Sequence, residues 1–459
     1  MARRAARRDP DAPPEDAVRS GRHPRARTVT RMTGILPYPN ADAPSEELIS
    51  RCVHCGLCLP TCPTFAVLGV EMDSPRGRIR LMKTVWEGRV SADAPAFAKH
   101  IGQCLDCRAC ETACPSGVEY GKLVEAARSQ ILAATTRSLG ERGIRSAAFD
   151  WLLPHRRVLA VFARLSVTAK RLGVPRVLRA TGLRGGARLA EMLELLPDSA
   201  TMERLDTVIP ASGPVRARVA MFSGCVMGSV FGGTNAATAR VLARNGVEVH
   251  VIRPQTCCGA LHAHAGERER ARELARRNVA AFAGEEVDAI IVNAAGCGAA
   301  MKEYGWLLKD DTAWATRAAE FASRVRDATE FLGDLGLRAV PSPMRVRAAY
   351  DDPCHLLHGQ RVREQPRALL AAIPGLEMVP LEEADWCCGS AGTYNVTQPE
   401  LARTLLERKV ANIEKTGADV VVTANPGCLM QIQSGLRRAG SRTRVVHLID
   451  LLDEAYRAG

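Results

Sequence analysis

Two runs of four cysteines constrain this chain more than any other feature of its sequence. The first run, RCVHCGLCLPTCP, holds Cys52, Cys55, Cys58 and Cys62. The second, CLDCRACETACP, repeats the same spacing with Cys104, Cys107, Cys110 and Cys114, and a proline follows the last cysteine of each run. Disulfide frameworks belong to short secreted chains, whereas this chain has 459 residues and its first 31 lack the apolar core of a signal peptide. Grouped thiols in such a chain favour metal ligation.

The spacing of each run is typical of thiolate ligands around a cubane 4Fe–4S cluster. Three regularly spaced cysteines wrap one face of the cube, and the proline turns the chain away after the fourth. In two-cluster ferredoxins the fourth cysteine of each run binds the other cluster. We therefore predict one cluster on Cys52, Cys55, Cys58 and Cys114, and a second on Cys104, Cys107, Cys110 and Cys62. Two structural zinc sites are the alternative, but zinc uses cysteine pairs without this pattern.

The segment between the runs predicts a helix. SPRGRIRLMKTVWEGRV offers Ser74 as an N-cap and Pro75 in the first turn. Its arginines would lie near the anionic clusters, where they either tune the cluster potentials or stay solvated. We expect residues 45–130 to form a mainly helical, ferredoxin-type domain with two 4Fe–4S clusters.

Positive charge is concentrated in two places. The formal net charge is +12; residues 1–31 hold nine arginines and four acids, and residues 136–190 hold twelve Lys or Arg and two acids. We predict that residues 1–44 are a disordered basic tail or an over-long start, with residues 1–31 left untranslated in the second case. No zinc-finger spacing or aromatic RNA-binding motif is present, which argues against a nucleic-acid partner. No apolar run reaches the length of a membrane span.

A second internal repeat begins near residue 216. In each copy a strand-like stretch ends on one cysteine, a Cys-Cys-Gly motif follows, and another strand-like stretch ends on a last cysteine. The first cysteine precedes the pair by 32 and 33 residues in the two copies, and the pair precedes the last cysteine by 39 and 40. We assign residues 216–340 and 341–459 to the two copies. Their cysteines are Cys225, Cys257, Cys258 and Cys297, and then Cys354, Cys387, Cys388 and Cys428.

Helical patterns alternate with the strand-like stretches of both copies. NAATARVLARNG and EQPRALLAAIPG follow the first cysteine, and longer helical patterns follow the Cys-Cys-Gly motif. This alternation predicts parallel α/β layers, with each cysteine in a loop beyond the carboxyl end of a strand, where open α/β sheets bind ligands. The fold class expected is α+β overall: a mainly helical two-cluster domain, a helical basic middle segment and a duplicated α/β domain.

These motifs resemble a known family. The Cys-Cys-Gly repeat is similar to the cysteine-rich domain of heterodisulfide reductase subunits and of iron–sulfur subunits of quinone-linked glycolate, lactate and glycerol-3-phosphate dehydrogenases. From about residue 45 to residue 455 the chain resembles the iron–sulfur subunit of glycolate oxidase in the order and length of its parts. The stretches that carry the resemblance are RCVHCGLCLPTCPTF, CCGALHAHAG, DPCHLLHGQRVREQPR and WCCGSAGTYN.

The resemblance implies an electron-transfer subunit with no flavin and no catalytic residue of its own. An FAD-containing partner subunit would oxidise a 2-hydroxy acid, with glycolate as the first expectation and D-lactate as the second. Electrons would pass through this chain toward a quinone or another membrane acceptor, at the inner face of the cytoplasmic membrane. The iron–sulfur subunit of a lactate or anaerobic glycerol-3-phosphate dehydrogenase, or a thiol redox enzyme of the heterodisulfide reductase type, are the alternatives.

The role of the Cys-Cys-Gly cysteines stays open from the sequence. In heterodisulfide reductases each motif ends in C-x2-C and supplies five thiolates, but here Ala300 and Gln431 stand where the fifth cysteine would be. Four thiols per copy could hold an additional iron–sulfur cluster or zinc, with His355, His262 or His358 completing a site. Reduced thiols buried in a core are the alternative.

The middle segment, residues 131–215, carries no cysteine. RVLAVFARLSVTAKRL and ARLAEMLELL predict amphipathic helices rich in arginine. We expect residues 145–180 to attach to an anionic membrane surface, and residues 180–215 to pack as a helical linker between the other domains.

Overall fold

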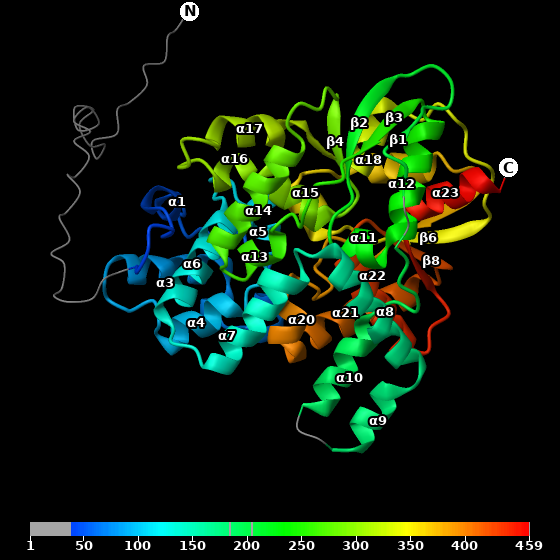
Figure 1. Cartoon of the computed structure of the whole chain (residues 1–459). Coiled ribbons are helices and arrows are strands. Elements are labelled where there is room, and N and C mark those ends of the chain that lie inside the picture. Colours follow the sequence, from blue (N-terminus) through cyan, green and yellow to red (C-terminus); the bar gives the residue numbers. More distant parts are fainter. Residues whose placement is uncertain (1–37, 183–184, 203–204, 459) are drawn as a thin grey trace, which may run out of the picture.

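The computed structural model describes residues 38–182, 185–202 and 205–458. A helical N-terminal part is followed by a helical connecting segment and then by two α/β units (Figure 1). This order and the α+β class confirm the fold predicted from the sequence. The predicted basic tail lies outside the described residues up to position 37.

Short helices build the N-terminal part and hold the two cysteine runs between them. Pro63, the proline after the first run, is the first residue of α2, and Cys62 is its N-cap. The helix predicted after Ser74 is α3; the Ser74 hydroxyl accepts a hydrogen bond from the Gly77 amide, 3.0 Å away. The elements are α1 (Glu46–Ser50), α2 (Pro63–Leu68), the 3-10 turn η2 (Glu71–Asp73), α3 (Pro75–Trp86), α4 (Pro95–Gly102), α5 (Ala109–Thr112) and α6 (Tyr120–Ala134).

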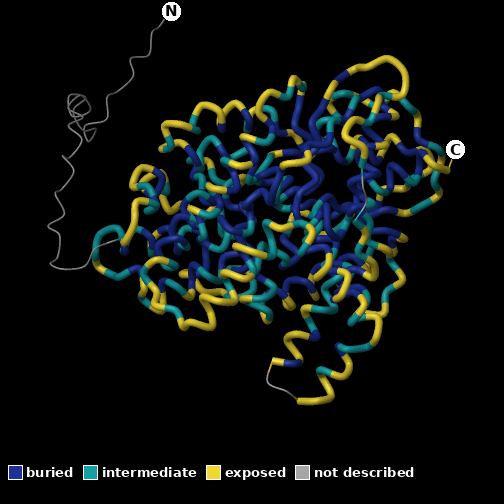
Figure 2. The backbone as a smooth tube through the Cα atoms, viewed as in Figure 1, coloured by how far each residue is buried: buried dark blue, intermediate teal, exposed yellow. Residues whose placement is uncertain are grey.

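The connecting segment forms an exposed arm. The two amphipathic helices expected in this region are present as α8 and α10, and Figure 2 shows the α9–α10 end of the arm largely exposed at the bottom of the view. The arm is tied back to the second α/β unit where Arg437 donates to the Glu194 carbonyl, at 2.7 Å. Its elements are α7 (Leu139–Ser146), η3 (Ala147–Leu152), α8 (Arg156–Arg171), α9 (Val174–Ala180) and α10 (Gly186–Leu195). Across the described ranges, no helix is both long enough and apolar enough to span a bilayer.

The first α/β unit is a five-stranded sheet in the order β1-β3-β2-β4-β5, in which only β1 runs antiparallel. Its strands are β1 (Val208–Ile209), β2 (Ala217–Phe222), β3 (Val247–Val251), β4 (Ala289–Val292) and β5 (Val325–Asp327). Its helices are α11 (Val226–Val230), α12 (Gly232–Arg244), α13 (Ala260–His264), α14 (Arg268–Ala281), α15 (Ala295–Lys302), α16 (Tyr304–Leu307), α17 (Ala315–Arg324) and α18 (Ala328–Leu335).

The second unit is a four-stranded parallel sheet in the order β7-β6-β8-β9. Its strands are β6 (Val346–Tyr350), β7 (Leu376–Val379), β8 (Val420–Thr423) and β9 (Arg444–His447). Its helical elements are η4 (His355–Gly359), α19 (Glu364–Ala371), α20 (Tyr394–Thr397), α21 (Pro399–Thr416), α22 (Pro426–Ala439) and α23 (Leu448–Arg457). Because β6, β7, β8 and β9 take the places of β2, β3, β4 and β5, the two units share one topology.

The two units pack around a common core. Buried residues of β2 and β4 in the first sheet belong to the same hydrophobic cluster as residues of β6 and β8 in the second, with α12, α18, α19 and α23 between the sheets. The central strands β4 and β8 are buried along their whole length, as expected of parallel strands covered on both faces. The repeats therefore face each other as parts of one body.

Two details of the α/β prediction were wrong. A fourth parallel strand, β5 or β9, closes each unit although none was expected, because these strands are three and four residues long and carry little pattern. Cys297 and Cys428 were expected in loops but lie in the first turns of α15 and α22. Pro426 at the first position of α22 was the available sign of an early helix start.

Candidate iron–sulfur site

Both cysteine runs fold into the same loop. The residues before and after the second cysteine have positive φ in each run: His54 (56°) and Gly56 (88°), then Asp106 (55°) and Arg108 (63°). Only glycine adopts this region freely, so Arg108 needs support. An ion pair supplies that support: Nη2 of the buried Arg108 donates to the partly exposed carboxylate of Glu303 at 2.9 Å. The two loops therefore curl alike, as a duplicated ligand motif requires.

The cysteines of the two runs gather around two adjoining cavities. The first cavity is lined by Cys52, Cys55, Cys58 and Cys114, and also by Cys110, which it shares with the second. The second is lined by Cys62, Cys104, Cys107 and Cys110. Each cavity thus has three cysteines of one run and the fourth of the other. This is the grouping predicted from the sequence, while metal ligation itself stays a prediction.

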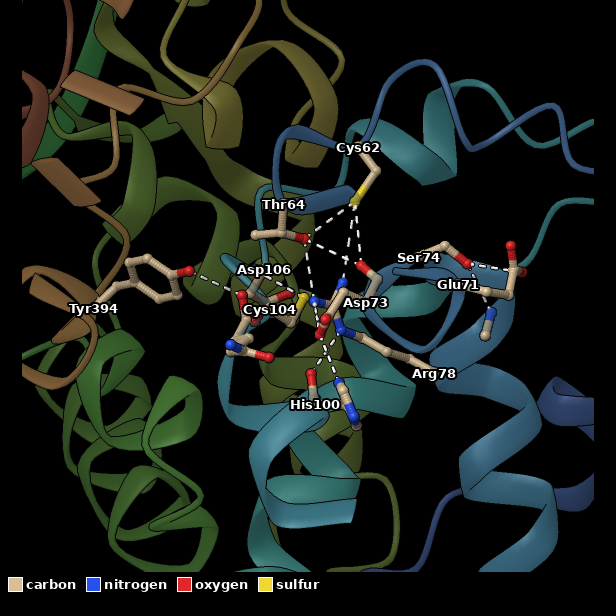
Figure 3. A network of polar contacts seen from close by, with 12 residues as sticks. Cys62, Thr64, Glu71, Asp73, Ser74, Arg78, His100, Cys104, Asp106 and Tyr394 are labelled. Atoms are coloured by element: carbon tan, nitrogen blue, oxygen red, sulfur yellow. Dashed lines mark hydrogen bonds and ion pairs between the residues drawn. The ribbon is translucent and has the colours of Figure 1, made fainter. Parts of the chain in front are cut away.

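The second cavity has a buried set of polar groups around its sulfurs (Figure 3). The Thr64 hydroxyl lies 3.3 Å from Cys62 Sγ, the Tyr120 hydroxyl 3.7 Å from Cys104 Sγ, and the Asp106 amide donates to Cys104 Sγ at 3.3 Å. Hydrogen bonds to the sulfurs are one of the means by which a protein sets the potential of an iron–sulfur cluster.

Arg78 is the cation of this network. Its side chain is 1% exposed, and its Nη1 lies 4.0 Å from Cys62 Sγ. The other nitrogens donate to Thr64 Oγ1 at 3.1 Å, to Asp73 Oδ1 at 3.4 Å and to the His100 carbonyl at 2.7 Å. The sequence left open whether the arginines of α3 are solvated or lie near a cluster. Arg78 is not solvated. The available signal was its position on the apolar face of α3, one turn before Met82.

The two cavities differ in their access to solvent. Cys62, Cys104, Cys107 and Cys110 are all buried, whereas Cys55 is exposed. The side chains of Val53 and Leu57, which flank Cys55 in its loop, are also exposed. A group bound in the first cavity would therefore lie at the molecular surface, and one bound in the second would lie inside.

The Cys-Cys-Gly cysteines form two separate quartets, one in each unit. In the first quartet Cys225 Sγ lies 3.3 Å from Cys257 Sγ, and Cys258 Sγ lies 3.1 Å from Cys297 Sγ. In the second, hydrogen bonds link Cys387 to Cys354 and Cys388, and Cys388 to Cys428. All eight thiols thus lie at the carboxyl ends of the parallel strands, as the repeat predicted.

The second quartet has a fully buried cation, whereas the cation described near the first quartet is the half-buried Arg156, beside Cys225. Lys409 Nζ lies 2.9 Å from Asp351 Oδ1, and both side chains are 2% exposed. Hydrogen bonds from Cys387 and Cys428, and then from the Ser390 backbone, together with the charge of Lys409, outweigh the effect of burial and lower the pKa of Cys388 well below the ordinary thiol value. Gly259 packs on Ala271 in the first unit as Gly389 packs on Ala402 in the second, so α14 and α21 are equivalent helices. The neutral Asn278 of α14 then occupies the position that Lys409 has in α21.

The second quartet adjoins the second cavity. Cys107 and Cys387 belong to one buried cluster, with Leu105 and Tyr394, and Cys354 packs against it. The Tyr394 hydroxyl donates to the Gln103 carbonyl at 2.9 Å (Figure 3). The first quartet packs instead on the connecting arm, where Leu159 contacts the cluster that holds Cys225 and Cys257. The two quartets therefore have different neighbours.

Each of the three histidines predicted as further ligands forms a hydrogen bond with a backbone carbonyl. His355 Nε2 lies 3.1 Å from the Asp106 carbonyl, His262 Nε2 lies 2.8 Å from the Phe149 carbonyl, and His358 Nε2 lies 3.3 Å from the Asp385 carbonyl. Each contact occupies one ring nitrogen and leaves the other, Nδ1, to be considered as a ligand: Nδ1 of His262 has no hydrogen-bond partner among the described residues, and Nδ1 of His358 lies 3.0 Å from the Thr112 hydroxyl. Metal ligation by these histidines therefore stays a prediction, because a histidine ligand commonly donates its other N–H to a carbonyl. The contacts join the second unit to the cysteine runs and the first unit to the arm.

One buried cluster of charged side chains was not predicted from the sequence. His264 Nδ1 lies 3.1 Å from Asp106 and 2.9 Å from Glu125, and the ring stacks on His355. These three groups could hold a cation, but Arg108 and Arg128 lie within 4 Å of the carboxylates and supply the countercharge. No local pattern relates Asp106 to His264, because the fold brings them together across more than 150 residues of sequence.

Family models match the cysteine runs, the arm and both α/β units. A 4Fe–4S dicluster domain model matches residues 48–118, a model of the linker region of glycolate oxidase iron–sulfur subunits matches residues 140–205, and a cysteine-rich domain model matches residues 219–302 and 348–433. The last two models correspond to the arm and to the duplicated units.

Full-length relatives agree with these models. The chain is 43% identical over 422 residues to a Bacillus subtilis (strain 168) protein named "Probable glycolate oxidase iron-sulfur subunit", covering 89% of this chain and 94% of that protein. It is 35% identical to the "Glycolate oxidase iron-sulfur subunit" of Escherichia coli (strain K12), over 90% of this chain and 95% of that one. By its cysteine runs, its linker and its duplicated units, the chain belongs to the family of glycolate oxidase iron–sulfur subunits.

Proposed function

We propose that this chain is the electron-transfer subunit of a flavin-dependent 2-hydroxy-acid dehydrogenase, with glycolate as the substrate of the complex. The observation that carries the proposal is the pair of adjoining cavities, each of which has among its lining residues three cysteines of one run and the fourth of the other, with Cys110 shared between them. Cys52, Cys55, Cys58 and Cys114 would hold one 4Fe–4S cluster, and Cys104, Cys107, Cys110 and Cys62 the other.

The residues around the cavities fit such clusters. Four thiols per cavity match the ligand count, and the donors to Cys62 and Cys104 suit sulfurs that carry negative charge. A bound cluster would supply reversible one-electron chemistry. The chain itself holds the ligands in place through its two matching loops and keeps water from the second cavity by burial.

A flavin-bearing partner would contact the chain where Cys55 reaches the surface. Exposed apolar side chains surround that point, and we call them the cluster-one rim: Val53, Leu57, Val70 and Met72. The rim is also cationic. Burial is the largest cause of the lowered pKa of the neighbouring His54, and the positive charges of Arg80, Lys83 and Arg76 lower that pKa further. An apolar face edged with carboxylates on the partner would complement it.

The two quartets would add metal sites to the chain. Their cysteines could hold a further iron–sulfur cluster or zinc, and the neighbourhood of Cys107 and Cys387 favours a redox role for the second quartet over the first. The absence of a fifth cysteine in both units argues against the disulfide chemistry of heterodisulfide reductases.

The arm would attach the chain to the inner face of the cytoplasmic membrane. On α8, Phe162 and Leu165 are exposed, while Leu159 and Ala163 face inward. Arg157 and Arg164 are exposed near the apolar pair and suit anionic headgroups. Their neighbour Arg156 is half-buried, and its carbonyl accepts a hydrogen bond from Ser229.

Anaerobic co-expression with a flavin-containing subunit of a glycolate oxidase tests the proposal. Addition of glycolate should bleach the iron–sulfur absorbance of the complex, and a partner prepared alone should reduce only its flavin. Greater bleaching by lactate or glycerol 3-phosphate would identify that compound, and not glycolate, as the substrate of the complex. Oxidation of glycolate by this chain without a flavin partner would overturn the proposal.

A further inference from the structure

A cavity of about 190 Å³ lies between the cysteine runs, the arm and the second unit. It opens beside the exposed Thr397, and Leu105 and Tyr394 belong to its lining. Residues from α4, α6, α13 and α20 contribute to it, and so do Arg137 and Arg145 at the two ends of the α7 region. None of the sixteen cysteines lines it, so it is distinct from the cysteine sites described above, although His264 and Arg128 of the buried charge cluster border it.

The lining combines apolar walls with hydrogen-bond donors. Leu105, Ile131 and Leu132 supply apolar surface. The cationic residues are Arg128, Arg137, Arg145 and His264. The carboxylates nearby already have partners, because Glu267 pairs with Arg145, and Asp106 and Glu125 pair with His264. The cavity thus offers donors and few acceptors.

Among the arginines of the cavity, Arg137 has the fewest hydrogen bonds and ion pairs within the described residues. Its Nη1 donates to the Leu132 carbonyl at 2.9 Å, and within the described ranges it takes part in no ion pair. His264 uses Nδ1 for its carboxylates, and its Nε2 has no partner among the residues described. A ligand that fits has acceptor oxygens on a largely apolar body. Such a ligand needs no negative charge.

The floor of the cavity adjoins the sulfur sites. Leu105 and Tyr394 line the cavity and also pack with Cys107 and Cys387 in one buried cluster. A bound ligand would therefore touch the same two side chains that cover the second cysteine cavity and the second quartet. This is the position that an electron acceptor requires.

The rim of the cavity leads to exposed apolar surface. Leu139 and Ile144, on the helix between Arg137 and Arg145, are 80% and 73% exposed. A ligand with a polar-edged ring and a hydrocarbon tail could place the ring in the cavity and the tail along α7. Proximity to the membrane-facing arm would let such a ligand enter from the lipid.

We propose that this cavity binds the head group of a quinone. The inference rests on the proposed function, which calls for an acceptor of the electrons taken from a 2-hydroxy acid. The overall reaction balances, because the hydroxy acid loses two electrons and two protons on becoming a 2-oxo acid, and the quinone gains two of each on becoming a quinol. Arg137 would donate to a quinone oxygen, and Leu132 would pack on the ring.

Photolabelling of the full chain with an azido-benzoquinone, in its oxidised form and without turnover, tests the proposal. We expect label on peptides from residues 128–145 or 391–398, and we expect an excess of decylubiquinone to remove it. Arg137→Gln should weaken quinone binding roughly three- to tenfold, the effect of losing one hydrogen bond. Leu132→Trp should fill the cavity and abolish the label. Arg142→Gln, an exposed residue of α7 outside the cavity, is the matched control and should label like the wild type.

Label on other peptides, or equal label in Arg137→Gln and the control, would overturn the proposal. Removal of the label by oxalate or glyoxylate but not by decylubiquinone would assign the cavity to small carboxylates and would also overturn it. Iron and sulfide analysis of the same preparation separates this result from the proposed function. A chain that lacks iron yet carries the label would refute the function and keep the site.

Discussion

The guanidinium of Arg78 lies 4.0 Å from the sulfur of Cys62, and both side chains are buried. Asp73 is the only carboxylate paired with Arg78 among the described residues, and it also accepts from His100 at 2.9 Å. A fixed cation in surroundings of low dielectric stabilises negative charge on a neighbouring thiolate far more than an exposed one does. The relation between Arg78 and Cys62 therefore concerns both stability and redox potential.

Arg78→Gln should lower the midpoint potential of the second cluster and leave that of the first nearly unchanged. The reduced cluster carries one more negative charge, which loses its nearest buried cation. The variant should also lose about 3–5 kcal/mol of stability, because Asp73 is left buried without its partner. A redox titration followed by EPR, together with thermal unfolding, measures both effects. Arg80→Gln, on the exposed side of α3, is the control; equal potentials in the two variants would refute the role.

The buried pair of Lys409 and Asp351 should behave as one unit. Lys409→Met alone should cost about 3–5 kcal/mol, because it leaves the carboxylate of Asp351 buried without a countercharge. The double variant Lys409→Met with Asp351→Leu should recover much of that loss. Denaturant titration of the two single variants and the double variant gives the coupling. Additive losses would show that the pair does not interact as the geometry implies.

His264 should make stability depend on alkaline pH. Burial alone would lower its pKa, but the hydrogen bonds and charges of Asp106 and Glu125 raise the pKa to about 9. Because the folded chain holds this proton more tightly than the unfolded chain, the stabilisation is complete below pH 6.5 and is lost as the pH rises through about 9. In His264→Gln the free energy of unfolding should not show the loss of about 3 kcal/mol that the wild type shows across that pH window. His155→Gln, at an exposed site, should keep it, and a shared slope would contradict the assignment.

Replacement of the exposed apolar pair on α8 should release the chain from lipid. Phe162→Glu with Leu165→Glu should lower flotation with anionic vesicles by about tenfold or more, since each side chain gains roughly 1.5–3 kcal/mol on full burial. Val340→Glu, at an exposed apolar residue outside the arm, controls for added charge. A wild-type chain that does not float, or variants that float equally, would count against attachment through α8.

Much of the site was predictable because its information is local. The cysteine spacing gave the grouping of thiols around both cavities, and Ser74 and Pro75 gave the start of α3. The equal spacing of the Cys-Cys-Gly motifs predicted two matching units with their cysteines at one edge of each sheet. These features depend on residues a few positions apart or on a repeat within the chain.

The contacts between the parts were not predictable in this way. The pairing of Asp106 with His264 and the packing of Tyr394 beside Cys107 join segments that the sequence does not relate. Lys409 stands on a helix with many charged residues, and only the alignment of α14 with α21 shows that it replaces Asn278. The short strands β5 and β9 were missed because sheet pairing, and not their own pattern, determines their conformation.

Metal analysis joined to cysteine exchange tests the central claim most directly. The anaerobically purified wild type should contain about eight iron and eight sulfide, with two interacting cubane signals after reduction by dithionite, and about twelve or more iron if a quartet holds a further cluster. Cys114→Ser should alter the same EPR signal as Cys52→Ser, and Cys62→Ser the same signal as Cys104→Ser. Zinc without sulfide, or a Cys114→Ser variant that alters the signal of Cys104, would contradict the account.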